Sequence, residues 1–496
     1  MLFEMKKIIA LFIACVLLIT PLTALADQPV YSDSVTLYRA SGASRAIDST
    51  AYAAFETRLC EAADRLQTSV DLAGLSISGN DIQNYYIQFL YTHPEYFYLS
   101  NSFSYALTGD QTVVLFNPSY TMGADTVAAA KAELNHVVAD IAGSVSEGMP
   151  KRDIALVLHD YIVLNCAYDN NTALGISQNP NAYTAYGCLV EGLSVCEGYS
   201  RAYQLLLREF DIPCYLVSSE AMAHMWNMIQ IGGEYYHVDL TWDDALYTMG
   251  DSDDVYDVNG YVLHDYFMLT DAQMLAKDHY DWQYAPGNAQ DDVYTDAFYD
   301  VSVISGVFDI DGYQYYLYVT GEIMKRDPQT GDVTTIFELP EDTYVEDGKI
   351  REWTPDRATL GYNGTDLCFN TATAIYKLNL ETAQASLLCE PDIEEGYIVG
   401  FSFEGFSNTI IYDTRTAGRF TDNNVLTIST NYGDLNGDQS VNAKDLMILR
   451  KHLAGYTEQI DLNLADVYQD NKVNLKDCLL LRQFLADWDV ALGEAV

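Results

Sequence analysis

The sequence predicts a multidomain α+β protein, and three observations lead to this fold class. Helical spacing recurs between residues 44 and 210, alternating strand patterns run through 296–430, and a loop–helix unit occurs twice near the C-terminus. At 496 residues, the chain has room for about three or four domains. We divide it into a signal peptide (1–26), an α+β N-terminal extension (27–149), a central domain (150–290), a β-rich repeat domain (291–430) and an all-α C-terminal domain (431–496).

The N-terminus has the pattern of an export signal. Two lysines, Lys6 and Lys7, precede an apolar run that ends in the small-residue pattern Ala24-Leu25-Ala26. No later apolar run reaches the ~20 residues that a membrane-spanning helix needs. We therefore expect a secreted, extracellular protein with no transmembrane segment.

Charge and cysteine content limit the classes of partner. The chain has 26 Lys+Arg against 71 Asp+Glu, so its formal net charge is 26 − 71 = −45. Such a surface repels phosphate backbones, which argues against nucleic-acid binding. Cleavage of the signal would remove Cys15 and leave eight of the nine cysteines, an even number compatible with disulfides or with free thiols.

The N-terminal extension is expected to mix helices with one strand. "SRAIDSTAYAAFETRLCEAADRLQ" has helical spacing, and we predict Ser49-Thr50 as its cap. An alternating strand is expected around "QTVVLF". "DTVAAAKAELNHVVADIAGSV" and "KRDIALVLHDYIVLNCAYD" predict two further helices.

The β-rich domain contains an internal repeat. "IMKRDPQTGDVTTIFELP" (323–340) aligns with "IYKLNLETAQASLLCEP" (375–391), and "NTIIYDTRTAGRFTDNNVLTI" reads as a degenerate third copy. Repeats of this length suggest propeller-like blades, but three copies are too few to close an ordinary propeller. No constellation of catalytic residues is visible in this domain.

The C-terminal domain repeats one loop–helix unit at an offset of 32 residues. Oxygen-bearing residues stand at alternate positions of both loops, the spacing of EF-hand calcium loops. Asp445 replaces the usual bidentate Glu, Tyr468 stands where a ligand is expected, and neither loop has Gly at position 6. We predict up to two Ca²⁺ ions, with Ser440 and Lys472 ligating through backbone carbonyls, and these ligands: Asp434, Asn436, Asp438, Ser440, Asn442 and Asp445 in the first loop; Asp466, Asp470, Lys472, Asn474 and Asp477 in the second.

With these loops, residues 430–490 resemble type I-like dockerin modules. The resemblance implies calcium-dependent folding and docking onto a cohesin module of a scaffoldin, as in cellulosome-type complexes that degrade plant polysaccharide. By family analogy, the residues that follow each loop's ninth position, with part of the next helix, would contact cohesin: Ala443, Lys444, Lys451, His452, Leu475, Lys476 and Gln483.

Cys196 is the candidate nucleophile of the central domain. Apolar and aromatic residues at helical spacing follow it, and Asp211-Ile212-Pro213 ends that helix. Cys196 therefore lies at or near a helix N-terminus, where unpaired amides and the helix dipole favour a thiolate.

A predicted hairpin supplies the candidate base. Two strand-like runs flank Gly232-Gly233, and a two-residue turn there places His224 and Asp239 as diagonal neighbours on one face. A carboxylate so placed fixes the tautomer of an imidazole that serves a thiol. His237 shares the face and is the rival base. Taken singly, each residue has an ordinary alternative: a core histidine, a capping aspartate and a disulfide cysteine.

Residues 150–290 resemble the transglutaminase-like superfamily, whose papain-like core uses Cys, His and Asp in this chain order. The matching motifs are "LHDYIVLNCAYD", "LVEGLSVCEGYSRAYQLL" and "HMWNMIQIGGEYYHVDLTWDD", with Glu197 and Ser200 where Gln and Ala are frequent. The resemblance implies that Cys196 is the nucleophile, His224 the base and acid, and Asp239 the orienting group, with no cofactor for catalysis.

The functional expectation is a cysteine transferase or protease. Its thiolate would attack an amide of a protein or peptide, and an amine or water would then take the acyl group from the thioester. The alternative is a non-catalytic scaffold component that binds peptide or glycan. A glycoside hydrolase is suggested only by the kind of enzyme that dockerins accompany in such complexes, and no carboxylate pair in a recognisable module supports it.

Overall fold

The computed structural model describes the chain between residues 30 and 492, apart from several short segments. The segments left out within this range are 32–34, 38–46, 249–254, 295–296, 298, 300–301, 405–408, 417–418, 428–431, 436–440, 457–459, 461, 469–471, 487, 489 and 491. The predicted signal peptide lies outside the described residues. By contacts the chain forms two compact units, residues 1–402 with 412–423 and residues 403–411 with 424–496. Within the described ranges, no helix combines the length and apolar character that a bilayer crossing needs.

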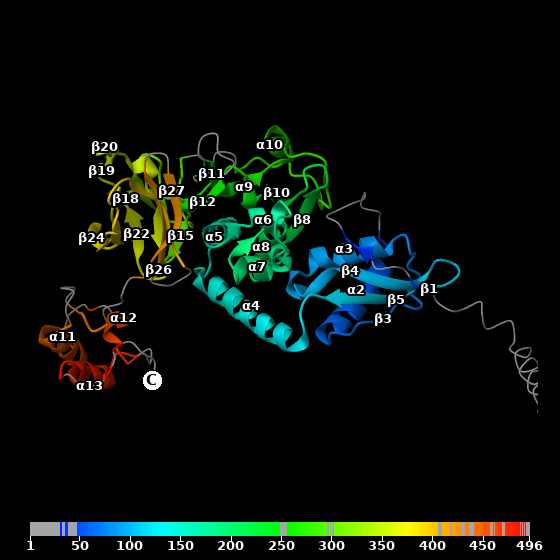
Figure 1. Cartoon of the computed structure of the whole chain (residues 1–496), viewed down its shortest axis with the longest axis horizontal. Coiled ribbons are helices and arrows are strands. Elements are labelled where there is room, and N and C mark those ends of the chain that lie inside the picture. Colours follow the sequence, from blue (N-terminus) through cyan, green and yellow to red (C-terminus); the bar gives the residue numbers. More distant parts are fainter. Residues whose placement is uncertain are drawn as a thin grey trace, which may run out of the picture. The chain divides into compact units, whose positions relative to one another are not determined.

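The N-terminal part is an antiparallel sheet with helices packed on it (Figure 1). Its strand order is β1-β4-β5-β3, with β2 paired to β4. The strands are β1 (Val30–Tyr31), β2 (Val35–Thr36), β3 (Val70–Asp71), β4 (Leu99–Leu107) and β5 (Val113–Tyr120), and the helices are α2 (Ser49–Asp64), α3 (Ile82–Thr92) and the 3-10 turn η1 (Pro94–Tyr96). The predicted cap of α2 was wrong by one residue, because the Asp48 carboxylate accepts from the amides of Thr50 and Ala51 at 2.9 and 2.8 Å.

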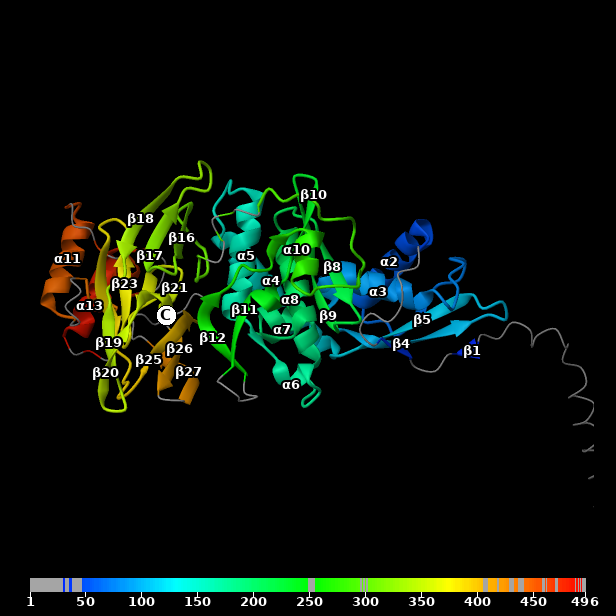
Figure 2. The ribbon, with the colours of Figure 1, turned by 90° about the horizontal axis from the view of Figure 1, so that it is seen from above.

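The central part places helices against a five-stranded sheet of order β13-β10-β9-β8-β14. Figure 2 shows α8 beside β8 and β9. The sheet strands are β8 (Cys214–Ser219), β9 (His224–Ile231), β10 (Glu234–Val238), β13 (Phe267–Leu269) and β14 (Trp282–Gln283). The helices are α4 (Ala124–Ser144), α5 (Lys151–Asn165), α6 (Asn170–Ala173), η2 (Pro180–Tyr183), α7 (Ala185–Leu189), α8 (Cys196–Arg208), α9 (Leu240–Asp243) and α10 (Asp271–Ala276). Two short ladders complete this part, β6 (Ala167–Tyr168) with β7 (Leu193–Ser194) and β11 (Asp244–Thr248) with β12 (Val255–Val262).

The β-rich part contains the predicted repeat as two four-stranded antiparallel sheets, β15–β18 and β21–β24. Both sheets are irregular at the same repeat position, between Ile323 and Met324 in β17 and between Ile375 and Tyr376 in β23. A hairpin and a three-stranded sheet, β25-β26-β27, accompany them. The strands are β15 (Phe308–Ile310), β16 (Tyr313–Leu317), β17 (Glu322–Arg326), β18 (Val333–Glu338), β19 (Asp342–Glu346), β20 (Lys349–Trp353), β21 (Leu360–Tyr362), β22 (Leu367–Asn370), β23 (Ile375–Asn379), β24 (Gln384–Cys389), β25 (Tyr397–Phe403), β26 (Thr409–Thr416) and β27 (Arg419–Thr427), with a turn η3 (Pro355–Arg357). The β-rich repeat domain is thus present as separate sheets, and a propeller-like arrangement of its repeats stays a prediction.

Buried polar contacts tie α5 to the first of these sheets. Arg326 on β17 donates to Asp153 at 2.9 Å and also to Gln314, and all three side chains are buried. Asp160, also on α5, accepts from the amide of Val307 at 2.7 Å. The central and β-rich parts are therefore joined by specific, desolvated bonds.

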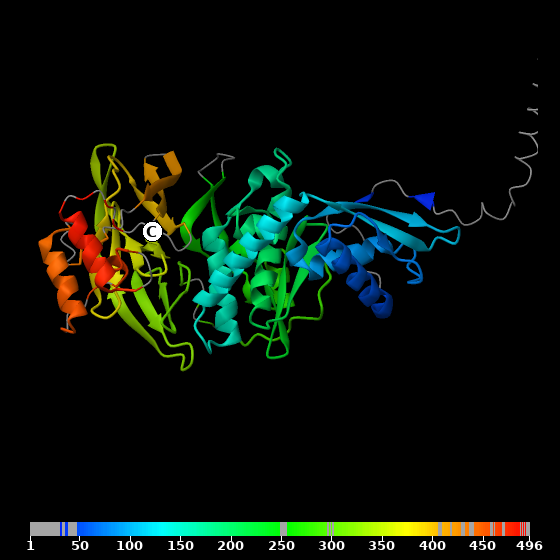
Figure 3. The ribbon, with the colours of Figure 1, turned by 90° about the horizontal axis from the view of Figure 1, so that it is seen from below.

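The second unit ends in three helices, α11 (Ala443–Leu453), α12 (Leu462–Ala465) and α13 (Leu475–Phe484). In Figure 3, α11 and α13 lie side by side. Leu449 and Leu481, which stand at the same position of the two repeats, are fully buried in their shared core. The predicted duplication is thus also a pairing of the two helices in space.

Candidate functional site

Cys196 is the first residue of α8 and is 1% exposed. The preceding residue, Val195, is extended and provides no side-chain cap, so the helix begins with backbone amides only. The dipole of this 13-residue helix favours negative charge at that end. The thiol therefore lies where a thiolate is stabilised, as the sequence predicted.

Gly198 explains why the helix can begin so close to its neighbours. A Cβ at this position would lie 1.8 Å from the Ser194 Oγ and 2.6 Å from the carbonyl oxygen of Ala182. Only glycine admits both contacts. The glycine two residues after Cys196 thus lets the first turn of α8 pack directly against backbone.

The predicted hairpin is present with its predicted register. Glu234 pairs with Ile231 and Val238 with Asn227, across a two-residue turn in which Gly232 and Gly233 both have positive φ. His224 opens β9, and Asp239 follows β10 as the N-cap of α9. His224 Nε2 lies 2.6 Å from Asp239 Oδ2.

The electrostatics of the pair favour a charged imidazole. Burial alone would lower the pKa of His224, but the charge and hydrogen bond of Asp239, with a hydrogen bond to Cys196, raise that pKa to about 10. Burial acts to raise the pKa of Asp239, yet the charge and hydrogen bonds of His224 and His279 hold it far below the ordinary value. Because Asp239 occupies Nε2 of His224, Nδ1 is the nitrogen left for the thiol. The three residues form a connected Cys–His–Asp constellation.

The rival base, His237, is occupied elsewhere. Its Nε2 lies 2.9 Å from Asp271 Oδ1, and its Nδ1 accepts from Trp226 Nε1 at 3.0 Å. Its ring is fully buried, and burial lowers its pKa despite the nearby carboxylate. With both ring nitrogens engaged, His237 serves the packing beneath the site.

Two partners of Asp239 were not predicted. Thr241 donates to its Oδ1 at 2.7 Å, and His279 Nε2 lies 2.8 Å from its Oδ2. Thr241 follows from the local turn into α9, but His279 lies 40 residues away in a segment without a motif. The only signal in the sequence was that this residue is a histidine, one of eight in the chain.

Among the residues that the structure describes, two groups place potential metal-ligating atoms within 4.8 Å of one another: His224, Asp239 and His279, and also His159, Asp160 and His264. In both groups these atoms already bond to each other, at 2.6 and 2.8 Å in the first and 2.7 and 3.0 Å in the second. We therefore describe both as hydrogen-bonded networks. In the second, hydrogen bonds from His159 to Asp160 and Asp243 overcome burial and raise the pKa of His159 to about 9.

A cleft of about 650 Å³ opens beside the start of α8. Its walls include Phe97 and Asn101 from the N-terminal part and Tyr183 from η2, and Glu197 and Arg201 of α8 also line it. Arg201 donates to one oxygen of Glu197 at 3.1 and 2.8 Å. Glu197 also lines a pocket of about 60 Å³ together with His224, so the cleft and the pocket of His224 share one wall.

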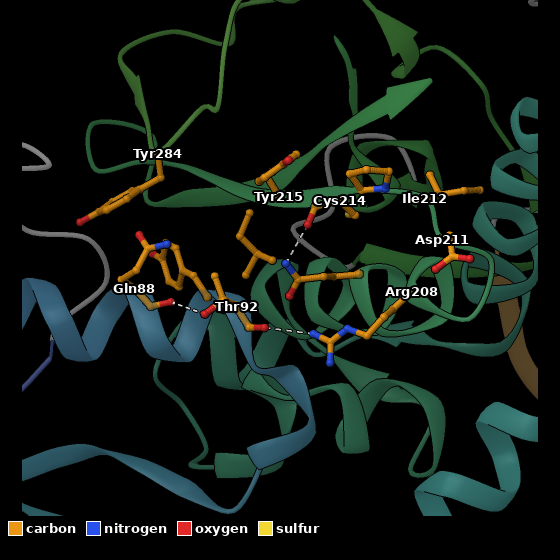
Figure 4. Close-up of a pocket in the computed structure, with 12 residues that line it drawn as sticks. Gln88, Thr92, Arg208, Asp211, Ile212, Cys214, Tyr215 and Tyr284 are labelled. Atoms are coloured by element: carbon orange, nitrogen blue, oxygen red, sulfur yellow. Dashed lines mark hydrogen bonds between the residues drawn. The ribbon is translucent and has the colours of Figure 1, made fainter. Parts of the chain in front are cut away.

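A second cavity, of about 420 Å³, lies near the other end of α8 (Figure 4). Tyr215 and Tyr284 line it, and Arg208 donates to the carbonyl of Thr92 at 3.0 Å. Two further lining residues, Tyr91 and Leu216, also pack in the buried cluster that contains Cys196. Tyr91 comes from α3, so the N-terminal part contributes to the packing around the thiol.

The two C-terminal loops have matching geometry in the described residues. Asp445 accepts from the amides of Leu435 and Asn442 at 2.9 and 2.8 Å, and Asp477 accepts from those of Tyr468 and Asn474 at 3.0 and 2.7 Å. Each loop buries a pair of carboxylates, listed here by loop: Asp434 with Asp445, and Asp466 with Asp477. Burial, followed by the charge of Asp466, raises the pKa of Asp477. Buried paired carboxylates fit a hard cation such as Ca²⁺.

The remaining predicted ligands divide into two groups. Asn442 and Asn474 cap α11 and α13. The backbone carbonyl of Lys472 accepts from the side-chain amide of Asn474 at 2.9 Å. Asn436, Asp438, Ser440 and Asp470 lie outside the described residues. The proposed cohesin contacts Ala443, Lys444, Leu475 and Lys476 are exposed at the helix starts, whereas Lys451, His452 and Gln483 are half-buried near the helix ends.

Two known families match parts of the chain. Residues 139–240 match the transglutaminase-like superfamily, and residues 432–486 match the dockerin type I domain. The first range contains Cys196, His224 and Asp239, and the second contains both loop–helix copies. A search of curated proteins finds no match.

Several solved structures are similar to parts of this chain. A type I cohesin–dockerin complex from Clostridium thermocellum is 43% identical over 11% of this chain and 89% of that chain, with a TM-score of 0.11. A transglutaminase is 13% identical over 29% of this chain and 44% of that chain, with a TM-score of 0.21. An oligogalacturonate lyase in complex with manganese is 10% identical over 41% of this chain and 43% of that chain, with a TM-score of 0.15.

Proposed function

We propose that this chain, which carries a transglutaminase-like superfamily domain and a type I dockerin domain, is a secreted cysteine acyltransferase or peptidase of a cellulosome-type complex. The observation that carries the catalytic part is the hydrogen bond between Cys196, at the start of α8, and a His224 paired with Asp239. This is the nucleophile–base–orienter arrangement that covalent catalysis requires.

Acylation follows from the roles of these three residues. The Cys196 thiolate attacks an amide carbonyl and forms the carbon–sulfur bond, while backbone amides in the first turn of α8 provide donors for the oxyanion. The imidazolium of His224 gives its Nδ1 proton to the departing nitrogen as the carbon–nitrogen bond breaks. Asp239 keeps its contact with Nε2, so the ring stays oriented. The product is a thioester on Cys196.

Deacylation returns the enzyme. An amine or a water molecule loses a proton to His224 and attacks the thioester, and Cys196 leaves as thiolate. An amine gives cross-linking, whereas water gives proteolysis or deamidation. The same three residues serve both outcomes.

The donor substrate is a protein or peptide segment. The cleft beside α8 combines an aromatic wall with exposed polar groups, and it shares Glu197 with the pocket of His224. Its volume of about 650 Å³ lies within the range of ordinary ligand sites. A peptide lying there would present an amide toward the start of α8.

The dockerin domain would attach the enzyme to a cohesin module of a scaffoldin. Its loops would hold Ca²⁺ through the buried carboxylates Asp434, Asp445, Asp466 and Asp477, with the predicted loop oxygens completing each site. The bound ion supplies positive charge that compensates these carboxylates and fixes the loops before each helix. No catalytic step depends on it.

Acyl transfer is tested with a fluorescent primary amine as acyl acceptor and a casein-like protein as acyl donor. Wild-type protein should couple the amine to casein or cleave it, and Cys196→Ala should do neither. The matched control, Cys389→Ala on the edge strand β24, should behave as wild type. If wild-type protein neither couples nor cleaves, the chain is instead a non-catalytic binding component.

Attachment is tested by capture on an immobilised type I cohesin. The full chain should be retained with Ca²⁺ and released by a chelator. Retention that survives the chelator would contradict a calcium-dependent dockerin.

A further inference from the structure

His279 contacts the catalytic aspartate although no motif contains it. It lies between α10 and β14, is fully buried, and places Nε2 2.8 Å from Asp239 Oδ2. Its Nδ1 lies 3.2 Å from the carbonyl oxygen of Lys277. One oxygen of Asp239 thus bonds two histidines, His224 and His279.

The hydrogen-bond partners determine which form of His279 fits. A backbone carbonyl can only accept, and the ionised carboxylate of Asp239 can only accept. Both ring nitrogens of His279 must therefore donate, and only the imidazolium donates from both. Both contacts are satisfied at once only when both ring nitrogens carry a proton.

Aromatic rings surround this imidazole. The centroid of its ring lies 4.5 Å from that of Trp242, 5.1 Å from that of Trp226 and 5.2 Å from that of Tyr266. Aromatic groups at such distances attract a cation when it lies over their faces. The site can thus hold a desolvated positive charge.

The charged groups around the thiol are then nearly balanced. With both nitrogens of His279 protonated, two imidazolium rings, on His224 and His279, face the carboxylate of Asp239, and a thiolate on Cys196 supplies the second negative charge. Glu197 and Arg201, which neutralise each other, are the nearby pair on α8. Beyond them, His237 faces Asp271, and burial followed by the charge of Asp239 raises the pKa of Tyr266 to about 12.

We propose that His279 is a positioning residue of the reaction: it holds Asp239 in place through the same oxygen that contacts His224, and it supplies the positive charge that balances the thiolate. The inference rests on the proposed function, because it concerns the same thiol. When His224 loses its proton to the leaving nitrogen, Asp239 remains bonded to His279 and Thr241. The carboxylate therefore stays directed at His224 throughout the cycle.

The test is the pH profile of Cys196 alkylation by iodoacetamide, which reports the thiolate without any acyl substrate. His279→Gln retains an N–H donor toward Asp239 but has no charge, and His279→Phe has neither. Removal of the positive charge should shift the rising limb of the profile to higher pH by roughly 0.5–1 unit in both variants. The maximal rate should be retained in His279→Gln and reduced in His279→Phe. Peptide mass spectrometry assigns the label to Cys196, and circular dichroism checks folding.

Each outcome separates this inference from the proposed function. Profiles of His279→Gln and wild type that superimpose would overturn the role of His279, even if acyl transfer is intact. A lower maximal rate without a shifted limb would also overturn it, because a purely structural role has that effect. A shifted limb in a protein without acyl transfer would support the role of His279 and count against the proposed function alone.

Discussion

His224 Nε2 lies 2.6 Å from Asp239 Oδ2, and this contact joins the two strands of a β-hairpin at the end farthest from its turn. It leaves Nδ1 of the imidazole as the nitrogen that meets the Cys196 thiol. The positions of base and orienter are thus set by strand register, whereas that of the nucleophile is set by the start of a helix. Two independent local structures meet in one site.

Asp239→Asn should strongly reduce acyl transfer. The amide would no longer compensate the imidazolium, and it could place a donor against Nε2, which disfavours the productive tautomer. We expect kcat/KM to fall by roughly 10³- to 10⁴-fold. Asp271→Asn is the matched control, because it removes the carboxylate partner of His237, and its effect should be small. Equal losses in the two variants would contradict the assignment.

The pH dependence of stability should report the His224–Asp239 pair. The folded-state pKa of His224 is raised from 6.5 to about 10, so this group's contribution is fully present below pH 6.5 and is lost as pH rises to about 10. The free energy of unfolding of the wild type should therefore decrease across this window, by up to about 1.4 kcal/mol per pH unit for one proton.

Asp239→Asn should make this decrease shallower, because without the carboxylate the pKa of His224 falls back. Urea unfolding at a series of pH values measures both slopes. Since His159, with its pKa of about 9, contributes equally in both proteins, the difference belongs to the groups bonded to Asp239, His224 and His279. Identical slopes would show that the pair is not charged.

Tyr91→Ala should expose the thiol. Tyr91 reaches from α3 into the cluster of Cys196, Leu216 and Met225, so its removal opens a path to Sγ. The rate of Cys196 alkylation at fixed pH should rise several-fold, and stability should fall by on the order of 2–3 kcal/mol. Tyr91→Phe keeps the ring and should retain the wild-type rate. An unchanged rate in Tyr91→Ala would mean that access is controlled elsewhere.

Calcium stoichiometry should follow the two loops. Isothermal titration calorimetry of the full chain should give about two ions, and Asp445→Ala or Asp477→Ala should each remove about one. Each aspartate anchors one loop through two backbone amides. Asp347→Ala, in the turn between β19 and β20, is the control. Full stoichiometry in either loop variant would contradict the assignment of that loop.

The sequence was most informative where one short segment determines the structure. Gly232-Gly233 predicted the turn, and the turn fixed which residues face each other, so His224 and Asp239 could be paired in advance. The repeats likewise predicted matching loops and sheets. The cap of α2 shows where such local signals fail. Asp48, Ser49 and Thr50 are all good capping residues, and the sequence does not tell which of them caps the helix; in the structure it is Asp48.

Contacts between distant segments could not be predicted. His279 reaches Asp239 only because the chain returns after α10, and Tyr91 packs against the cluster of Cys196 only because α3 packs on the central part. Arg326 and Asp153 pair across 173 residues. No periodicity or spacing in the sequence indicates such contacts, since they depend on how complete helices and strands pack together.

The identity of the nucleophile is tested most directly by mass spectrometry of the mature protein. Within the described residues no disulfide joins the cysteines. After incubation with a peptide amide and rapid acid quenching, we expect an acyl adduct on Cys196 that disappears when a primary amine or hydroxylamine is added. Finding Cys196 instead in a disulfide in the resting protein, or unmodified while substrate is consumed, would contradict it.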